Sequence, residues 1–317
     1  MLISFVIACY YSENTIGKVV EGIIQQFKDK DGYDCEFILV NDGSTDGTYA
    51  TIKSLCEKYP FVKGINLMRN FGQHNALMAA LKHAKGDYVM GMDDDMQTHP
   101  SQVFKLIHKI EEGYDIVYGR YPQSKNGFFK KLSTSFNIMT SRAMLDMPKD
   151  IVESNFWILT DKVKDEVIKY DSYNPMLDAI FYQVTHNFGN VEVEHYKRES
   201  GKSGYTLRKL IRLWLAYWNY LVMPLRVSFV MGSVSAVLGM IFTIWLIYKK
   251  ITDPALPVGW ASTLCIMTLL FAAVLMVLGV VGEYLGKAIL ILNNTPQYII
   301  RETSNLDHPA EKIKEAE

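Results

Sequence analysis

The sequence has few of the features that mark several common classes of protein. Only four cysteines occur among its 317 residues, and they form neither a CxxC pair nor a spacing typical of metal ligands. Free thiols of this kind fit a reducing cytosol. The formal net charge is −1, so there is no basic excess that would favour a nucleic-acid partner. We therefore expect neither a disulfide scaffold nor a nucleic-acid-binding protein.

Glycine-rich phosphate-binding motifs are also absent. No G-x-G-x-x-G follows the first apolar run, where "ACYYSEN" stands, and no G-x-x-x-x-G-K-[ST] occurs anywhere. The segment "GVVGEYLG" is glycine-rich, but it lies at the end of a long apolar run and favours helix packing. A nucleotide bound by this chain must therefore be held by acidic and neutral groups together with a metal ion.

Charge is missing from two long runs near the C-terminus, 227–248 and 254–282. Each exceeds the roughly 20 residues that a helix needs to cross a bilayer. The alternative is two buried helices of a soluble core, but such helices seldom stay uncharged for so long. We predict transmembrane helices at 227–248 and 258–282, joined by a short extracytoplasmic loop at 249–257.

Basic residues near the two spans predict their orientation. The outer flanks carry more of them than the connecting loop, which places both termini in the cytoplasm of a multi-pass inner-membrane protein. The flanking residues are Arg208, Lys209, Arg212, Arg226, Lys287 and Arg301, against Lys249 and Lys250 in the loop. The N-terminal "MLISFVIACYYSEN" lacks a basic region and a cleavage site, so it is read as a strand rather than a signal peptide. We expect a cytoplasmic domain at 1–205, an interfacial amphipathic helix at 206–226 and a cytoplasmic tail at 283–317.

The first 119 residues alternate between short β-rich runs and helical patterns. The runs are "LISFVIACY", "CEFILVND", "VKGINLM", "DYVMGMD" and "DIVYG". This pattern predicts an α/β fold with a mainly parallel sheet and helices on both faces. Ligands of such sheets bind beyond the carboxyl ends of the strands. Asp42 and the triplet Asp93, Asp94, Asp95 follow two of the strands, so we expect one site on a shared rim.

The three adjacent aspartates need a positive partner. Neighbouring carboxylates raise one another's proton affinity unless a cation or solvent separates them. The alternatives are a metal site and a solvated acidic turn.

The motifs together resemble those of the family-2 GT-A glycosyltransferases. The segments are "SFVIACYYSENTI", "FILVNDGSTDGT", "LMRNFGQHNALMAAL", "GDYVMGMDDDMQTHP" and "YDIVYGRY", in this order. With the two apolar runs, the chain is similar over about residues 2–302 to the polyprenyl-phosphate glycosyltransferases. This resemblance implies a GT-A sheet followed by interfacial and transmembrane helices.

For the donor, the resemblance implies a UDP-sugar and a divalent metal, Mg²⁺ or Mn²⁺. Asp93 and Asp95 match the D-x-D motif, with Asp95 nearest the metal and Gln97 helping to complete its shell. Asp42 is implied as the acceptor for the uracil imide N–H. The remaining donor residues implied are Ala8, Tyr10, Glu13, Arg69 and Asp94, with Asp94 peripheral. Simple core packing is the alternative for Tyr10.

For the acceptor, the resemblance implies a polyprenyl phosphate. Basic residues interleaved with Phe and Met between residues 118 and 144 have the composition of a helix at an anionic membrane surface. Further on, "KRESGKSGY" lies where relatives carry an arginine and a G-x-S-x-Y pattern. The residues implied in phosphate binding are Arg120, Lys130, Lys131, Arg198, Lys202 and Ser203.

Asn155 departs from the family pattern, because many relatives carry an aspartate there. An amide cannot take a proton, whereas a phosphate acceptor is already anionic and needs no base. Asn155 therefore favours a phosphate acceptor, although Glu153 is close enough in sequence to act as a base. The catalytic residues implied are Asp93, Asp95, Asn155 and Arg198.

The function expected is metal-dependent, inverting transfer of one sugar from a UDP-sugar to a polyprenyl phosphate, undecaprenyl phosphate in a bacterium. Two spans are too few to move the product across the membrane, so a flippase and a periplasmic glycosyltransferase are expected partners, and a homo-oligomer is left open. Two alternatives stay open. One is a glycosyltransferase acting on a lipid hydroxyl, with Glu153 as base, and the other is a non-catalytic nucleotide-binding membrane protein.

Overall fold

The computed structural model describes residues 1–121, 151–194, 259–292 and 295–306, with the single residues 241, 245 and 248. The chain divides into two units, Met1–Ser203 with Pro296–Glu317 and Gly204–Thr295. The interfacial helix expected at 206–226 lies outside the described residues. So does nearly all of the span expected at 227–248. Both stay predictions.

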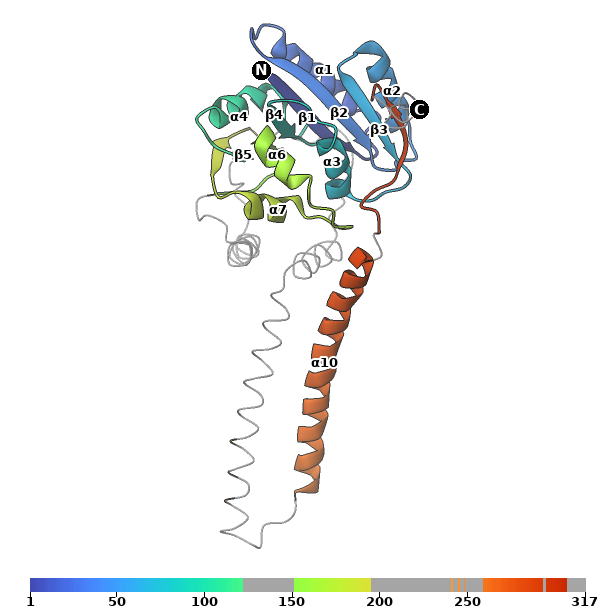
Figure 1. Cartoon of the computed structure of the whole chain (residues 1–317), viewed down its shortest axis with the longest axis vertical. Coiled ribbons are helices and arrows are strands. Elements are labelled where there is room, and N and C mark those ends of the chain that lie inside the picture. Colours follow the sequence, from blue (N-terminus) through green and yellow to red (C-terminus); the bar gives the residue numbers. More distant parts are fainter. Residues whose placement is uncertain are drawn as a thin grey trace, which may run out of the picture. The chain divides into compact units, whose positions relative to one another are not determined.

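Eight strands within the described ranges form one mixed sheet in the order β7-β5-β6-β4-β1-β2-β3-β8 (Figure 1). β1 runs parallel to β2 and to β4, and β2 runs parallel to β3. This confirms the predicted α/β fold with its largely parallel first half. The strands are β1 (Leu2–Cys9), β2 (Asp34–Asn41), β3 (Val62–Leu67), β4 (Tyr88–Gly91), β5 (Ile116–Arg120), β6 (Trp157–Thr160), β7 (Phe188–Glu192) and β8 (Ile300–Ser304).

Helices cover both faces of the sheet because successive strand side chains point to opposite sides. Ile3, Phe5 and Ile7 of β1 pack into one core with the apolar stripes of α1, α2 and α4. The helix α3 packs on the other face, against β1 and β2. The helical elements of this unit are α1 (Ile16–Phe27), α2 (Thr48–Lys58), α3 (Gln73–Leu81), η1 (Pro100–Gln102), α4 (Val103–Ile110), α6 (Asp161–Val167) and α7 (Leu177–Val184).

The far half of the sheet differs from a simple β-α series. The run "DIVYG" forms β5 as predicted, but β5 does not lie beside β4. Instead β6 lies between them and runs antiparallel to both, and β7 pairs in parallel with the outer side of β5. β6 is only four residues long, so its pattern gave no usable strand signal.

The C-terminal segment adds a strand that the sequence analysis missed. β8 pairs antiparallel with β3 and covers what would otherwise be an exposed sheet edge (Figure 1). Asn305 anchors its end, since its side-chain amide donates to the backbone carbonyls of Cys56 at 2.6 Å and Val62 at 2.9 Å. Part of the segment predicted to be a tail therefore belongs to the sheet.

The second unit contains the helix α10 (Trp260–Leu292), 33 residues long. It includes most of the segment predicted as the second span. Taking only residues that the structure describes, no helix is long and apolar enough to cross a membrane. The span at 258–282 thus stays a prediction.

Candidate active site

The two acidic strand ends meet on one rim of the sheet. β1 lies between β2, which Asp42 follows, and β4, which Asp93 follows. The backbone N–H of Tyr10, just after β1, donates to Asp94 Oδ2 at 3.1 Å. The next N–H, of Tyr11, donates to Ser44 Oγ at 3.1 Å in the loop after β2. The end of β1 thus joins the two acidic loops, as one shared site requires.

Asp42 holds the loop that follows β3. Its two carboxylate oxygens accept the backbone N–H groups of Phe71 at 2.7 Å and Gly72 at 3.0 Å. Burial raises the pKa of Asp42, and these hydrogen bonds together with the charge of Arg69 oppose that rise. Each oxygen keeps a second lone pair. The contact to a uracil base therefore stays a prediction, alongside this observed role.

Residues 68–72, which we call the donor segment, are fixed from two sides. On one side Gly43 has φ +67°, and a Cβ there would lie 2.3 Å from the carbonyl carbon of Arg69, so only glycine fits. On the other side lies the C-terminal segment, because the N–H of Met68 donates to Ile299 O at 2.9 Å. Arg69 is exposed, with its guanidinium 4.2 Å from the ring centre of Phe71.

The aromatic pair beside this segment faces solvent. Tyr10 and Tyr11 are 49% and 54% exposed, with their rings edge to face and their centres 4.6 Å apart. This excludes the core-packing alternative for Tyr10. Glu13 Oε2 accepts the N–H of Gly47 at 2.7 Å, at the start of α2, and Ala8 is half-buried near the end of β1. The exposed rings are available to stack on a base.

Two amides grip the first aspartate of the D-x-D motif. Gln73 Nε2 donates to Asp93 Oδ1 at 3.2 Å, and Asn155 Nδ2 donates to Asp93 Oδ2 at 3.3 Å. Burial and the charge of Asp95 raise the pKa of Asp93 to about 6, against the lowering effect of both amides. Two of the predicted catalytic residues, Asp93 and Asn155, are thus in contact, and the sequence analysis missed Gln73.

The other two aspartates point to different partners. Asp94 Oδ2 accepts the backbone N–H of Tyr10, and its peripheral role stays a prediction. Asp95 Oδ1 accepts the N–H of Gln97 at 3.0 Å. Met96, which lies between Asp95 and Gln97, has φ +62°. The turn therefore contains a backbone conformation that residues other than glycine rarely adopt. Burial also raises the pKa of Asp94.

The donor atoms at this turn suit a hard divalent cation. Asp93 and Asp95 supply carboxylate oxygens, and the charge of Asp95 raises the pKa of Asp93. Mg²⁺ is commonly held by one or two carboxylates plus substrate phosphates. The described residues contain no cluster of three or more His, Cys, Asp or Glu side chains that could hold a metal by themselves.

The predicted acceptor residues fall mostly outside the described part of the chain. Arg120 ends β5 with an exposed side chain. Those outside the described residues are Lys130, Lys131, Arg198, Lys202 and Ser203. Their grouping around a phosphate stays a prediction.

Glu153, Asp178 and His74 form a half-buried polar cluster next to the two amides that hold Asp93. The sequence analysis identified only Glu153 of these three residues. Burial and the charge of Asp178 raise the pKa of Glu153 to about 8. Burial also raises the pKa of Asp178, which the charge of His74 opposes, and it lowers the pKa of His74. His74 and Asp178 lie on α3 and α7, far apart in sequence, so no local motif could reveal them.

The comparisons with known proteins agree with these features. The family model described as Glycosyl transferase family 2 matches residues 4–166. The undecaprenyl-phosphate 4-deoxy-4-formamido-L-arabinose transferase of Proteus mirabilis is 30% identical, over 99% of this chain and 97% of the relative. The SfII prophage-derived bactoprenol glucosyl transferase of Shigella flexneri is 29% identical, over 96% and 98%.

Among solved structures, glucosyl-3-phosphoglycerate synthase from Mycobacterium tuberculosis, in complex with Mn²⁺ and UDP-glucose, has a TM-score of 0.49 and 18% identity. The match covers 66% of this chain and 73% of that chain. A likeness of this size says nothing about ligands.

Proposed function

Because the chain belongs to glycosyl transferase family 2 and is a glycosyltransferase, we propose that it moves one sugar from a UDP-sugar to a polyprenyl phosphate. The observation that carries the acceptor is similarity along almost the whole chain to transferases named for undecaprenyl phosphate and bactoprenol. We infer undecaprenyl phosphate as the lipid, and a cell-envelope glycan as the final destination of the sugar.

The site supports a donor with a nucleobase and a diphosphate. The exposed Tyr10 and Tyr11 rings offer a stacking surface beside Asp42, and the carboxylates of Asp93 and Asp95 offer ligands for Mg²⁺ or Mn²⁺. Such a cation, when bound, would stabilise the charge that develops on the leaving diphosphate. Asp93 is oriented for this by Gln73 and Asn155. Direct displacement would invert the anomeric carbon.

The residue beside Asp93 supports a phosphate acceptor rather than a lipid hydroxyl. Asn155 offers an amide where a hydroxyl acceptor would need a proton acceptor. Glu153, the alternative base, is half-buried, and its buried Oε1 has no hydrogen-bond partner among the described residues. A phosphate needs no base at neutral pH because its second ionisation lies near pH 6.

Membrane attachment is part of the proposal. α10 exposes apolar side chains spaced along its length, which is unusual on a soluble surface. Those exposed are Ile266, Met267, Leu270, Phe271, Val274, Leu278, Val281, Leu285, Ile289 and Leu292. We propose that 227–248 and 258–282 cross the inner membrane with both termini cytoplasmic. A flippase and a periplasmic glycosyltransferase would then use the product.

A panel of acceptors tests the proposed function. The full chain in lipid vesicles is incubated with UDP-sugars, Mg²⁺ or Mn²⁺, and either undecaprenyl phosphate or diacylglycerol. We expect UDP release and a labelled lipid only with undecaprenyl phosphate. Transfer to diacylglycerol alone would favour the glycolipid alternative, and UDP binding without transfer to either lipid would favour a non-catalytic protein.

A further inference from the structure

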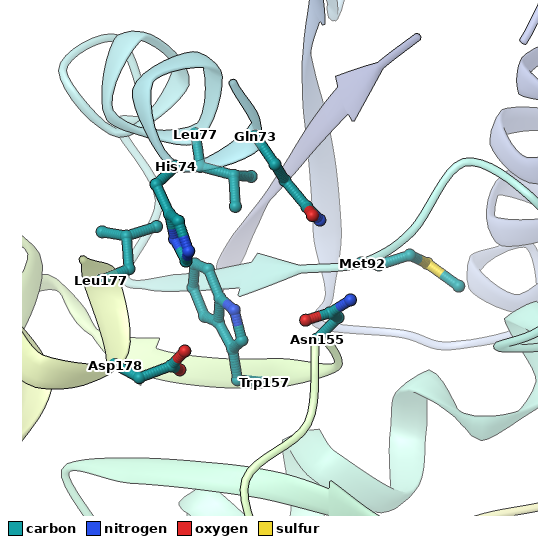
Figure 2. Close-up of a pocket in the computed structure, with 8 residues that line it drawn as sticks. All are labelled: Gln73, His74, Leu77, Met92, Asn155, Trp157, Leu177 and Asp178. Atoms are coloured by element: carbon teal, nitrogen blue, oxygen red, sulfur yellow. The ribbon is translucent and has the colours of Figure 1, made fainter. Parts of the chain in front are cut away.

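A small cavity opens beside Asp93, between α3, β6 and α7 (Figure 2). The cavity has room for about one water molecule or one hydroxyl group, because the centre of a water-sized sphere can occupy about 10 Å³ of it. The side chains that line it are Gln73, His74, Leu77, Met92, Asn155, Trp157, Leu177 and Asp178. We call this cavity the hydroxyl niche.

Two polar groups of the hydroxyl niche can take a further partner. Buried His74 Nδ1 has no hydrogen-bond partner within the described parts of the chain. Asp178 accepts a long hydrogen bond of 3.4 Å from Tyr118 Oη, and its carboxylate has further lone pairs. In Figure 2 both side chains point toward the indole of Trp157, from α3 and from α7. Buried polar groups left unpaired are costly, so a bound group that pairs with both would be stabilised there.

A hydroxyl meets both requirements at once. It donates one hydrogen bond, which a carboxylate accepts, and it can accept another from an imidazole N–H. Gln73 and Asn155, the two side chains that hold Asp93, also line the niche. A sugar joined to a diphosphate bound at Asp93 would therefore lie beside the niche.

We propose that the hydroxyl niche receives one hydroxyl of the donor sugar and that His74, Leu177 and Asp178 make the enzyme selective for a neutral sugar. This inference rests on the proposed function, since it takes the donor to be a UDP-sugar. The substrate class is then a neutral hexose or pentose with a free hydroxyl at the position that enters the niche.

Charge and size both exclude other sugars. The ionised carboxylate of a uronic acid has no proton to donate to Asp178, so it would set one negative hydrogen-bond acceptor against another. An acylamino group has several heavy atoms and exceeds the room for one hydroxyl. The apolar walls Leu77 and Leu177 offer it no hydrogen bonds.

Competition binding on the full chain tests the inference. UDP, UDP-glucose, UDP-galactose, UDP-xylose, UDP-N-acetylglucosamine and UDP-glucuronate compete against a fluorescent UDP analogue. At least one neutral sugar should bind about 10-fold or more tighter than UDP-glucuronate, because a mismatched buried polar site costs at least that much. Equal binding of UDP-glucuronate and the neutral sugars by the wild type would overturn the inference.

Two variants separate charge from size. Asp178→Asn should reduce the discrimination against UDP-glucuronate by about 10-fold. Leu177→Ala should reduce the discrimination against any UDP-sugar that is too bulky for the wild type. The matched control is Asp171→Asn, whose side chain is 81% exposed on the same stretch of chain and which should leave all ratios unchanged. Binding of UDP, which carries no sugar, shows whether each variant is folded.

The outcomes distinguish the two proposals. If the wild type does not bind UDP, the proposed function fails. If UDP binds to every variant but the sugar ratios match the wild type, the niche inference fails while the proposed function stands. If a variant loses UDP binding, the wild-type comparison of neutral and anionic sugars still decides the inference.

Discussion

The guanidinium of Arg301 donates a hydrogen bond to the backbone carbonyl of Met68 at 3.0 Å. Met68 begins the donor segment, and Arg301 lies on β8, which follows α10 in the chain. The backbone N–H of Met68 also donates a hydrogen bond to the C-terminal segment, at the carbonyl of Ile299. The strand that follows the apolar helix thus helps to position the loop that we propose contacts the donor.

Removing this contact should weaken donor binding more than turnover. Arg301→Ala loses a hydrogen bond from a charged group, so UDP should bind about 3- to 10-fold more weakly, with faster hydrogen exchange at residues 68–72. The control Lys53→Gln breaks an exposed ion pair to Glu302 on the same strand and should have little effect. Unchanged UDP affinity and exchange in Arg301→Ala would show that β8 does not position the segment.

Replacing Asn155 by aspartate should lower the rate, although many relatives carry the acid. Asn155→Asp would turn a hydrogen-bond donor to Asp93 into a third carboxylate against it and Asp95. We expect kcat to fall about 10-fold or more, because Asp93 loses a hydrogen-bond donor and gains a like charge, and to fall less in Asn155→Ala because it adds no charge. A gain in rate for Asn155→Asp would instead indicate that the enzyme uses a base.

Loss of the metal site should abolish transfer. Asp95→Asn, or EDTA added to the wild type, should cost roughly a thousandfold or more in rate, because the leaving diphosphate would go unneutralised. The matched control is Asp94→Asn, whose carboxylate accepts an N–H from Tyr10 and whose loss should cost about tenfold or less. Full turnover in EDTA would disprove the metal assignment.

Acid should weaken the packing of β2 against β3 through Glu36, which lies near the start of β2. Its carboxylate pairs with Lys63 Nζ at 2.6 Å, and the two side chains are only 8% and 14% exposed. Burial alone would raise the pKa of Glu36, but hydrogen bonds from Lys63, Ser4 and Lys85 outweigh it, so the pKa lies below the ordinary 4.5. Stability from this group is therefore complete above about pH 4.5 and is lost as pH falls through the lowered pKa.

Denaturant unfolding between pH 3 and 7 checks this. Glu36→Gln should lose about 3–5 kcal/mol at pH 7, since it leaves a buried lysine unpaired, and less at pH 3. The control Glu21→Gln removes an exposed pair with Lys58 and should change stability little at any pH. Equal losses at pH 3 and pH 7 in Glu36→Gln would contradict the assignment.

The sequence allowed prediction of the parts that depend on local pattern. Alternating runs predicted β1 to β5 and the helices between them, and the charged strand ends predicted the rim that Asp42 and Asp93 share. Contacts made across the fold were not predictable. β8 pairs with β3 only after the chain has passed through α10, and His74 of α3 and Asp178 of α7 come to one cavity only in the folded chain. Asn155 was predicted as a departure from the family, but its hydrogen bond to Asp93 required the structure.

The most direct test of the central claim follows both halves of the proposed product. The full chain in vesicles receives UDP-sugar labelled with ¹⁴C in the sugar, undecaprenyl phosphate labelled with ³²P, unlabelled diacylglycerol and Mg²⁺. The account predicts that UDP is released and that one lipid product carries ¹⁴C and ³²P in equal amounts. A lipid product that carries ¹⁴C without ³²P would show transfer to a hydroxyl and would contradict the account.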